Sequence, residues 1–251
     1  MKKELKHTDA TIPSPFERVR VRLKVCGMKY QENISVVAQL QPDYLGFIFY
    51  GKSSRFFDGI IPKLPESIKK VGVFVNATIN EVVEKVATYN LQAVQLHGDE
   101  SPEFCNELFC QFERPEKFGR EPLKNSSLNG SLSDVKIIKV FSINDDFNFD
   151  ELKPYETICD YYLFDTKGKL PGGNGYTFNW ETLKKYPSIK PYFLSGGIGL
   201  EEIVNIKKFL KTEASKYCYS IDVNSKFEIE PGLKDVQKLK EFKNNVTSSD
   251  F

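Results

Sequence analysis

The chain has 251 residues, of which 40% are hydrophobic, and its 35 Lys and Arg residues nearly balance 34 Asp and Glu residues. A net charge of +1 argues against a general polyanion-binding protein, so we expect no nucleic-acid partner. No apolar run approaches the roughly 18 residues that a membrane span needs, and no apolar segment follows the basic start, which argues against a membrane protein and a signal peptide.

The cysteine and histidine content bears on redox compartment and metal binding. The five cysteines are an odd number and form no Cys-x-x-Cys pair, and the chain has only two histidines. These counts argue against a disulfide scaffold and a structural zinc site. We therefore expect a cytoplasmic protein that holds no metal.

Eight short runs rich in β-branched and aromatic residues predict strands. They lie at 21–26, 44–49, 71–75, 93–97, 135–140, 161–165, 192–195 and 219–223. Apolar residues at helical spacing lie between several of them, as at 80–87 and 200–210, and a closing helix is predicted at 234–246. Strands that alternate with helices indicate parallel βαβ units. The length favours a single-domain (β/α)8 TIM barrel, with an open doubly wound sheet as the alternative.

The expected barrel spans residues 21–246. An N-terminal extension at 1–20 precedes it, and a frayed tail at 247–251 follows it. The polar stretch at about 111–134 predicts a long surface loop before the fifth strand.

Polar side chains stand at or near the ends of four predicted strands. Because catalytic groups of such barrels lie at the C-terminal ends of the strands, we expect Cys26, His97, Asp165 and Asp222 at one mouth. Alternation along a strand puts Lys24 on the same face as Cys26, and a neighbouring ammonium favours the reactive thiolate. Packing for the cysteine and local turn bonding for the polar groups are the alternative interpretations.

Glycine-rich loops follow the sixth and seventh predicted strands, at 172–175 and at Gly196 and Gly197. Glycine lets a backbone approach a ligand closely, and barrel phosphate sites commonly follow strands seven and eight. Ser225 and Lys226 follow the eighth strand. This pattern predicts a small phosphorylated ligand, although ordinary turns would also use these glycines.

Arg55 lies in the loop after the second predicted strand. A guanidinium can hold a carboxylate through two parallel hydrogen bonds. The alternative interpretation is a solvated surface charge.

With these residues assembled, the sequence resembles the phosphoribosylanthranilate isomerase family from about residue 22 to residue 242. The resemblance is carried by motifs that follow one another along the predicted strands, and their order makes it specific. Among them are KVCGM at 24–28, VQLHG at 94–98, LFDT at 163–166, LSGGI at 194–198, IDVNS at 221–225 and PGLKD at 231–235.

The resemblance implies a cofactor-free Amadori rearrangement in tryptophan biosynthesis, from N-(5-phosphoribosyl)anthranilate to 1-(2-carboxyphenylamino)-1-deoxyribulose 5-phosphate. It implies that Asp165 is the general acid and Cys26 the general base, and that Arg55 holds the anthranilate carboxylate. The remaining expected substrate-binding residues are His97, Asp222, Gly196, Gly197 and Ser225. We expect a monomer or a homodimer.

The chain departs from the family at Lys226, where glycine is frequent, which suggests an ammonium in the phosphate loop. Two other functions compete with the implied one. The first is another phosphosugar aldose–ketose isomerase on the same barrel, such as that of histidine synthesis. A member of that family would be expected to have two aspartates, one of them an acid where Cys26 stands. A non-catalytic phosphate-binding barrel would be expected to lack Cys26 or Asp165.

Overall fold

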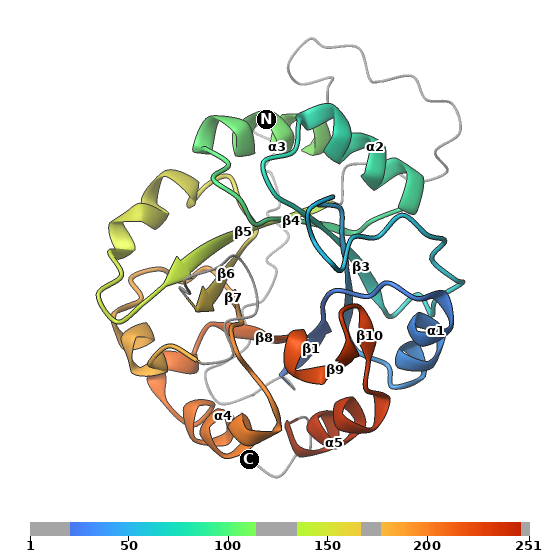
Figure 1. Cartoon of the computed structure of the whole chain (residues 1–251). Coiled ribbons are helices and arrows are strands. Elements are labelled where there is room, and N and C mark those ends of the chain that lie inside the picture. The colour runs from blue at the N-terminus through green and yellow to red at the C-terminus, as the bar shows by residue number, and fades with distance from the viewer. Residues whose placement is uncertain (1–20, 114–134, 167–176, 247–251) are drawn as a thin grey trace, which may run out of the picture.

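The computed structural model describes residues 21–113, 135–166 and 177–246. Eight parallel strands close into a barrel in chain order, with the last strand beside the first (Figure 1). They are β1 (Arg22–Val25), β2 (Tyr44–Ile48), β3 (Lys69–Phe74), β4 (Ala93–Leu96), β5 (Lys136–Ile143), β6 (Tyr161–Thr166), β7 (Tyr192–Leu194) and β8 (Cys218–Val223). The predicted barrel is confirmed, and the open sheet is excluded.

Helices ring the barrel on its outside (Figure 1). The α-helices are α1 (Gln31–Gln39), α2 (Ile79–Tyr89), α3 (Pro102–Glu113), α4 (Ile203–Phe209) and α5 (Val236–Val246). The 3₁₀-helices are η3 (Phe149–Tyr155), η4 (Trp180–Lys185), η5 (Leu200–Glu202), η6 (Glu213–Ser215) and η7 (Ser225–Phe227). Within the described ranges, no helix combines the length and the apolar character that crossing a bilayer requires.

Two predicted boundaries differ from the structure. The first residues of the polar loop expected from about 111 belong to α3, which continues to Glu113. The remainder of that loop, the extension at 1–20, the glycine cluster at 172–175 and the tail at 247–251 lie outside the described residues. The closing helix starts at Val236 rather than at 234, because β9 (Glu228–Glu230) and β10 (Leu233–Lys234) form an antiparallel hairpin before it.

Helix α2 illustrates how local sequence sets an element's bounds. The Thr78 side chain accepts a hydrogen bond from the backbone N–H of Glu81, whose carboxylate accepts one from the backbone N–H of Thr78. This capping box satisfies N–H groups that the first turn leaves unpaired. The helix ends at Tyr89, and the C-cap residue Asn90 adopts the left-handed conformation with φ 49°. Its buried face, Val82 and Val86, packs on the barrel.

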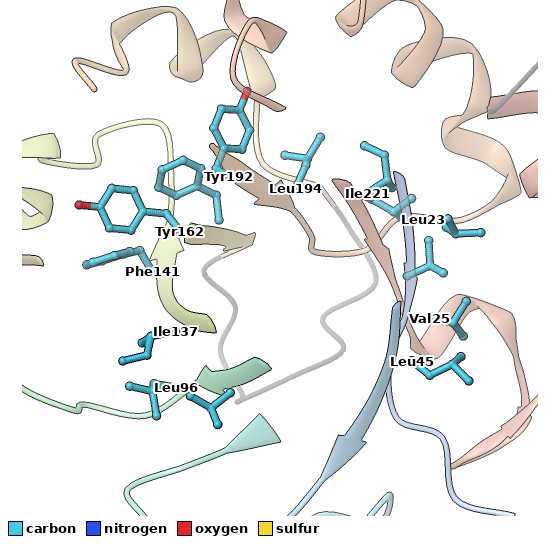
Figure 2. Close-up of a cluster of buried hydrophobic side chains, with 14 of the residues drawn as sticks. Leu23, Val25, Leu45, Leu96, Ile137, Phe141, Tyr162, Tyr192, Leu194 and Ile221 are labelled. Atoms are coloured by element: carbon cyan, nitrogen blue, oxygen red, sulfur yellow. The ribbon is translucent and has the colours of Figure 1, made fainter. Parts of the chain in front are cut away.

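Alternation along the strands divides the hydrophobic residues into two clusters. The outer cluster fills the space between strands and helices, and Figure 2 shows side chains such as Leu23, Val25 and Leu45 on that side of the strands. The inner cluster consists of Val71, Ala93, Ile138, Val140, Leu163 and Phe193, with Tyr44, Tyr161 and Tyr219 packed against it. Tyr44, Tyr161 and Tyr219 come from the first two residues of their strands, so they lie at the N-terminal end of the barrel, and the polar strand ends lie at the opposite, C-terminal mouth.

Candidate active site

Cys26 directly follows β1 and is almost completely buried, with 4% of its surface exposed. Its backbone N–H donates to the carbonyl of Val223 on β8 at 2.9 Å. The thiol lies against Gly46 of β2, where a Cβ atom would come within 2.8 Å of Sγ. Glycine at position 46 therefore makes the space that the thiol occupies.

A buried ion pair lies beside this thiol. Parallel register sets Lys24 of β1 opposite Asp222 of β8, and Nζ lies 2.8 Å from Oδ2. The side chains are 0% and 5% exposed. Burial lowers the pKa of Lys24, but attraction to Asp222 and Cys26 raises this pKa by more, so the ammonium form is kept. The other carboxylate oxygen, Oδ1, is buried and has no hydrogen-bond partner among the described residues.

The protonation of Cys26 differs from the expectation that Lys24 favours the thiolate. Lys24 does lower the pKa of the thiol, as predicted. Burial raises this pKa by more, because the charged thiolate loses its hydration in the interior. The net pKa therefore lies above its ordinary value, and the resting group is the thiol.

His97 and Asp165 meet at the mouth of the barrel, with Nε2 3.4 Å from Oδ2. The amide nitrogen of Gln95 lies 3.2 Å from Nδ1 of His97. This contact holds the ring in place, and Nε2 is the ring nitrogen that faces Asp165. The backbone N–H of Thr166 also donates to Asp165, at 3.0 Å. Two groups thus orient the carboxyl group at the end of β6.

The predicted groups converge on one place. Burial raises the pKa of Asp222, and its neighbours Lys24, Asp165 and His97 also act on this pKa through their charges. Because such charge effects fall off with distance, these side chains share the same electrostatic environment. The structure thus brings together strand-end groups from β1, β4, β6 and β8, as the sequence predicted.

Arg55 is 20% exposed and is not a solvated surface charge. Its Nε donates to Oε1 of Glu228 at 2.8 Å, and its Nη2 donates to Oε2 at 2.7 Å. Gly27, with φ +73°, leaves space for the aliphatic part of the Arg55 side chain, because a Cβ atom at position 27 would lie 2.9 Å from Cδ of Arg55. Sequence reasoning missed Glu228. The only signal for it was its place in the run after the eighth strand.

The expected phosphate loops lie after β7 and β8. Gly196 and Gly197 have φ values of +95° and +68°, a conformation that favours glycine, and a Cβ at Gly196 would collide with Thr166. Ser225 begins η7. Lys226 is paired with Glu201 of η5, with Nζ 2.8 Å from Oε1, so its ammonium links the two loops.

Comparisons with known proteins show the family to which the chain belongs. The sequence model of the family described as N-(5'phosphoribosyl)anthranilate (PRA) isomerase matches residues 23–122 and 118–245. The N-(5'-phosphoribosyl)anthranilate isomerase of Parabacteroides distasonis is 41% identical over 226 residues, covering 88% of this chain and 90% of the relative.

Solved structures give the same result. The phosphoribosyl anthranilate isomerase of Thermotoga maritima superposes with a TM-score of 0.69 at 27% identity, covering 90% of this chain and 98% of that one. A phosphoribosyl anthranilate isomerase in complex with reduced 1-(o-carboxyphenylamino)-1-deoxyribulose 5-phosphate has a TM-score of 0.65 at 25% identity, with the same coverage. The chain belongs to the N-(5'-phosphoribosyl)anthranilate isomerase family.

Proposed function

We propose that this isomerase of tryptophan biosynthesis converts N-(5-phosphoribosyl)anthranilate to 1-(2-carboxyphenylamino)-1-deoxyribulose 5-phosphate, with Asp165 as general acid and Cys26 as general base. The observation that carries the proposal is that Cys26, directly after β1, and Asp165, in β6, both act electrostatically on the buried Lys24–Asp222 pair. An aldose-to-ketose rearrangement needs one proton delivered and one removed, and this mouth holds a group for each.

In the first step, Asp165 protonates the ring oxygen of the furanose. The C1–O bond breaks, and the nitrogen lone pair forms an iminium ion at C1. His97 and the N–H of Thr166 hold the carboxyl group in place for this transfer. Proton transfer from a positioned group contributes about 10²–10⁴-fold to a rate.

In the second step, the thiolate of Cys26 removes the proton from C2, and the C–H electrons move toward the iminium to give an enolamine. Protonation at C1 and loss of the hydroxyl proton at C2 then give the ketone. The buried ammonium of Lys24 stabilises the thiolate while it exists. The unpartnered oxygen of Asp222 can accept a hydrogen bond from a sugar hydroxyl, which supports its role in orienting the substrate.

The two ends of the substrate bind at different loops in this proposal. Arg55 holds the anthranilate carboxylate, while Gly196, Gly197 and Ser225 hold the phosphate. Backbone N–H groups of glycines with positive φ are suited to a phosphate oxygen. All these residues belong to one chain, so the proposed site is complete in a monomer and in each subunit of a homodimer.

The test of the proposed function is turnover by the purified protein, followed as loss of the fluorescence of N-(5-phosphoribosyl)anthranilate. We expect turnover of this substrate and none of the aminoimidazole substrate of histidine synthesis. The reverse preference would support the other phosphosugar isomerase, and absence of both activities would support a binding barrel.

The raised pKa of Cys26 predicts the pH dependence of its ionisation. The thiol must be deprotonated to act as a base, and burial raises its pKa above the ordinary value of 9.0. We therefore expect the ultraviolet thiolate absorbance of the parent, taken as the difference from Cys26→Ser, to increase from pH 7 to pH 9 without reaching a plateau. Ultraviolet spectra of the two proteins in overlapping buffers measure it. A plateau already at pH 7 would show that the thiolate is pre-formed.

Replacing Arg55 by alanine separates binding from chemistry. Loss of charge-assisted hydrogen bonds to the substrate carboxylate costs about 1.5–3 kcal/mol, so KM should rise roughly 10- to 150-fold. The carboxylate persists from substrate to product, so kcat should change much less. Lys52→Ala, an exposed residue of the same loop, is the matched control. Equal KM values for Arg55→Ala and the parent would remove Arg55 from the substrate site.

We also propose that the protein is cytoplasmic. All five cysteines are free, and Cys26 works only in its reduced form. Loss of activity on mild oxidation, restored by a thiol reductant, is the expected result.

A further inference from the structure

The charged side chains of Arg55, Glu228 and Lys234 meet beside Cys26. Of these three, only Arg55 contacts substrate in the proposed reaction. The β9–β10 hairpin sets Glu228 opposite Lys234, and Nζ of the lysine lies 2.7 Å from Oε1 of the carboxylate. Arg55 bonds the same carboxylate from the other side. The backbone N–H of Gly232, at φ +89°, donates a further hydrogen bond to Oε1 at 3.0 Å. Glu228 therefore lies between two cations.

Lys234 is held in place at both its backbone and its ammonium. Its side chain is 0% exposed, and Nζ also donates to Oδ1 of Asn224 at 2.7 Å. Its backbone N–H donates to Oδ1 of Asn33 at 2.8 Å, and the amide of Asn33 donates back to its carbonyl at 2.9 Å. A buried lysine is costly unless it is paired, and this one is fixed by several hydrogen bonds.

Charge counting shows what Lys234 adds. Arg55, Glu228 and Lys234 carry charges that sum to +1, whereas Arg55 and Glu228 alone sum to zero. Glu228 occupies the Nε–Nη2 edge of the guanidinium, and Nη1 has no protein partner among the residues that the structure describes. A guanidinium presents five N–H donors, so its second edge can bind a second carboxylate.

We propose that Lys234 is a positioning residue for substrate recognition: it offsets the charge of Glu228, so that Glu228 orients Arg55 without cancelling its attraction for the substrate carboxylate. The proposal rests on the proposed role of Arg55 and assigns a function to the PGLKD motif at 231–235.

The first variant is Lys234→Met, which removes the charge and keeps a long unbranched side chain. We expect KM for N-(5-phosphoribosyl)anthranilate to rise about tenfold or more while kcat stays within about threefold. Inhibition by inorganic phosphate should be unchanged, because the phosphate loops lie elsewhere. Lys238→Met, which removes a half-exposed lysine from α5, is the matched control and should keep the parental KM. A parental KM in Lys234→Met, or a loss confined to kcat, would overturn the proposal.

The second variant tests charge balance rather than packing. Adding Glu228→Gln to Lys234→Met returns the net charge of the cluster to +1, since the amide is neutral and still accepts hydrogen bonds from Arg55. We expect KM to return to within about threefold of the parent. If Lys234 only supported the hairpin, the double variant would bind no better than the single one. That result would overturn the proposal.

A binding measurement separates this proposal from the proposed function. Calorimetric titration with anthranilate reports on the carboxylate site whether or not turnover occurs. Weaker binding in Lys234→Met and recovery in the double variant support the proposal, and equal binding in all proteins overturns it. Absence of turnover by the parent would instead count against the proposed function. If Lys234→Met does not fold by circular dichroism, the double variant decides alone: its KM should be near that of the parent, and a tenfold higher KM would contradict the proposal.

Discussion

Replacing Cys26 by serine should lower kcat by at least about 100-fold, which is about 2.7 kcal/mol of transition-state stabilisation. A serine hydroxyl has nearly the shape of the thiol and fits the space that Gly46 leaves. It is a far weaker acid than the thiol, so the oxyanion is not available to remove the proton from C2. The substrate contacts at Arg55 and at the phosphate loops are unchanged, so KM should stay close to that of the parent. Steady-state assays of the two proteins measure both values.

The matched control is Cys110→Ser, on α3, outside the barrel mouth. Its kcat should equal that of the parent within error. The melting temperatures of both variants show whether the fold is kept. Near-parental turnover by Cys26→Ser with an intact fold would mean that another group removes the C2 proton, and it would return Cys26 to a packing role.

The barrel was predictable because it rests on local, repeated patterns. Each strand carries its own run of β-branched and aromatic residues. All eight predicted runs overlap an observed strand, and their bounds differ from those of the strand by about three residues or fewer. Alternation then placed Cys26 and Lys24 on one face, and the barrel rule placed polar strand ends at one mouth. These inferences need no knowledge of distant contacts.

The electrostatics of the site were not predictable in the same way. Glu228 and Arg55 are separated by 173 positions, so nothing in the local sequence pairs them. The sequence predicts that Lys234 begins the closing helix, whereas the structure places it in β10. Two opposing effects set the pKa of Cys26: burial raises this pKa, and the charge of Lys24 lowers it. Burial is a property of the whole fold. The sequence therefore predicts that the strand-end groups meet, but it predicts neither the partners of Arg55 nor the balance of charges in the site.

Replacing Asp165 by asparagine should also lower kcat by at least about 100-fold, because an amide cannot donate the proton that opens the furanose ring. Asparagine keeps the size of the side chain and an oxygen that accepts from the N–H of Thr166. KM should therefore change by no more than about threefold.

Asp160→Asn is the matched control, since Asp160 directly precedes the same strand at the opposite end of the barrel and bonds the backbone N–H of Ile137. An asparagine oxygen can keep that hydrogen bond, so this variant should turn over like the parent. Pre-steady-state measurements add a second criterion. If ring opening is blocked in Asp165→Asn, no enolamine forms, and the absorbance of the bound substrate should remain constant during the first turnover. Normal formation of the open-chain product by Asp165→Asn would assign the acid to another group, and His97, 3.4 Å away, would be the next residue to replace.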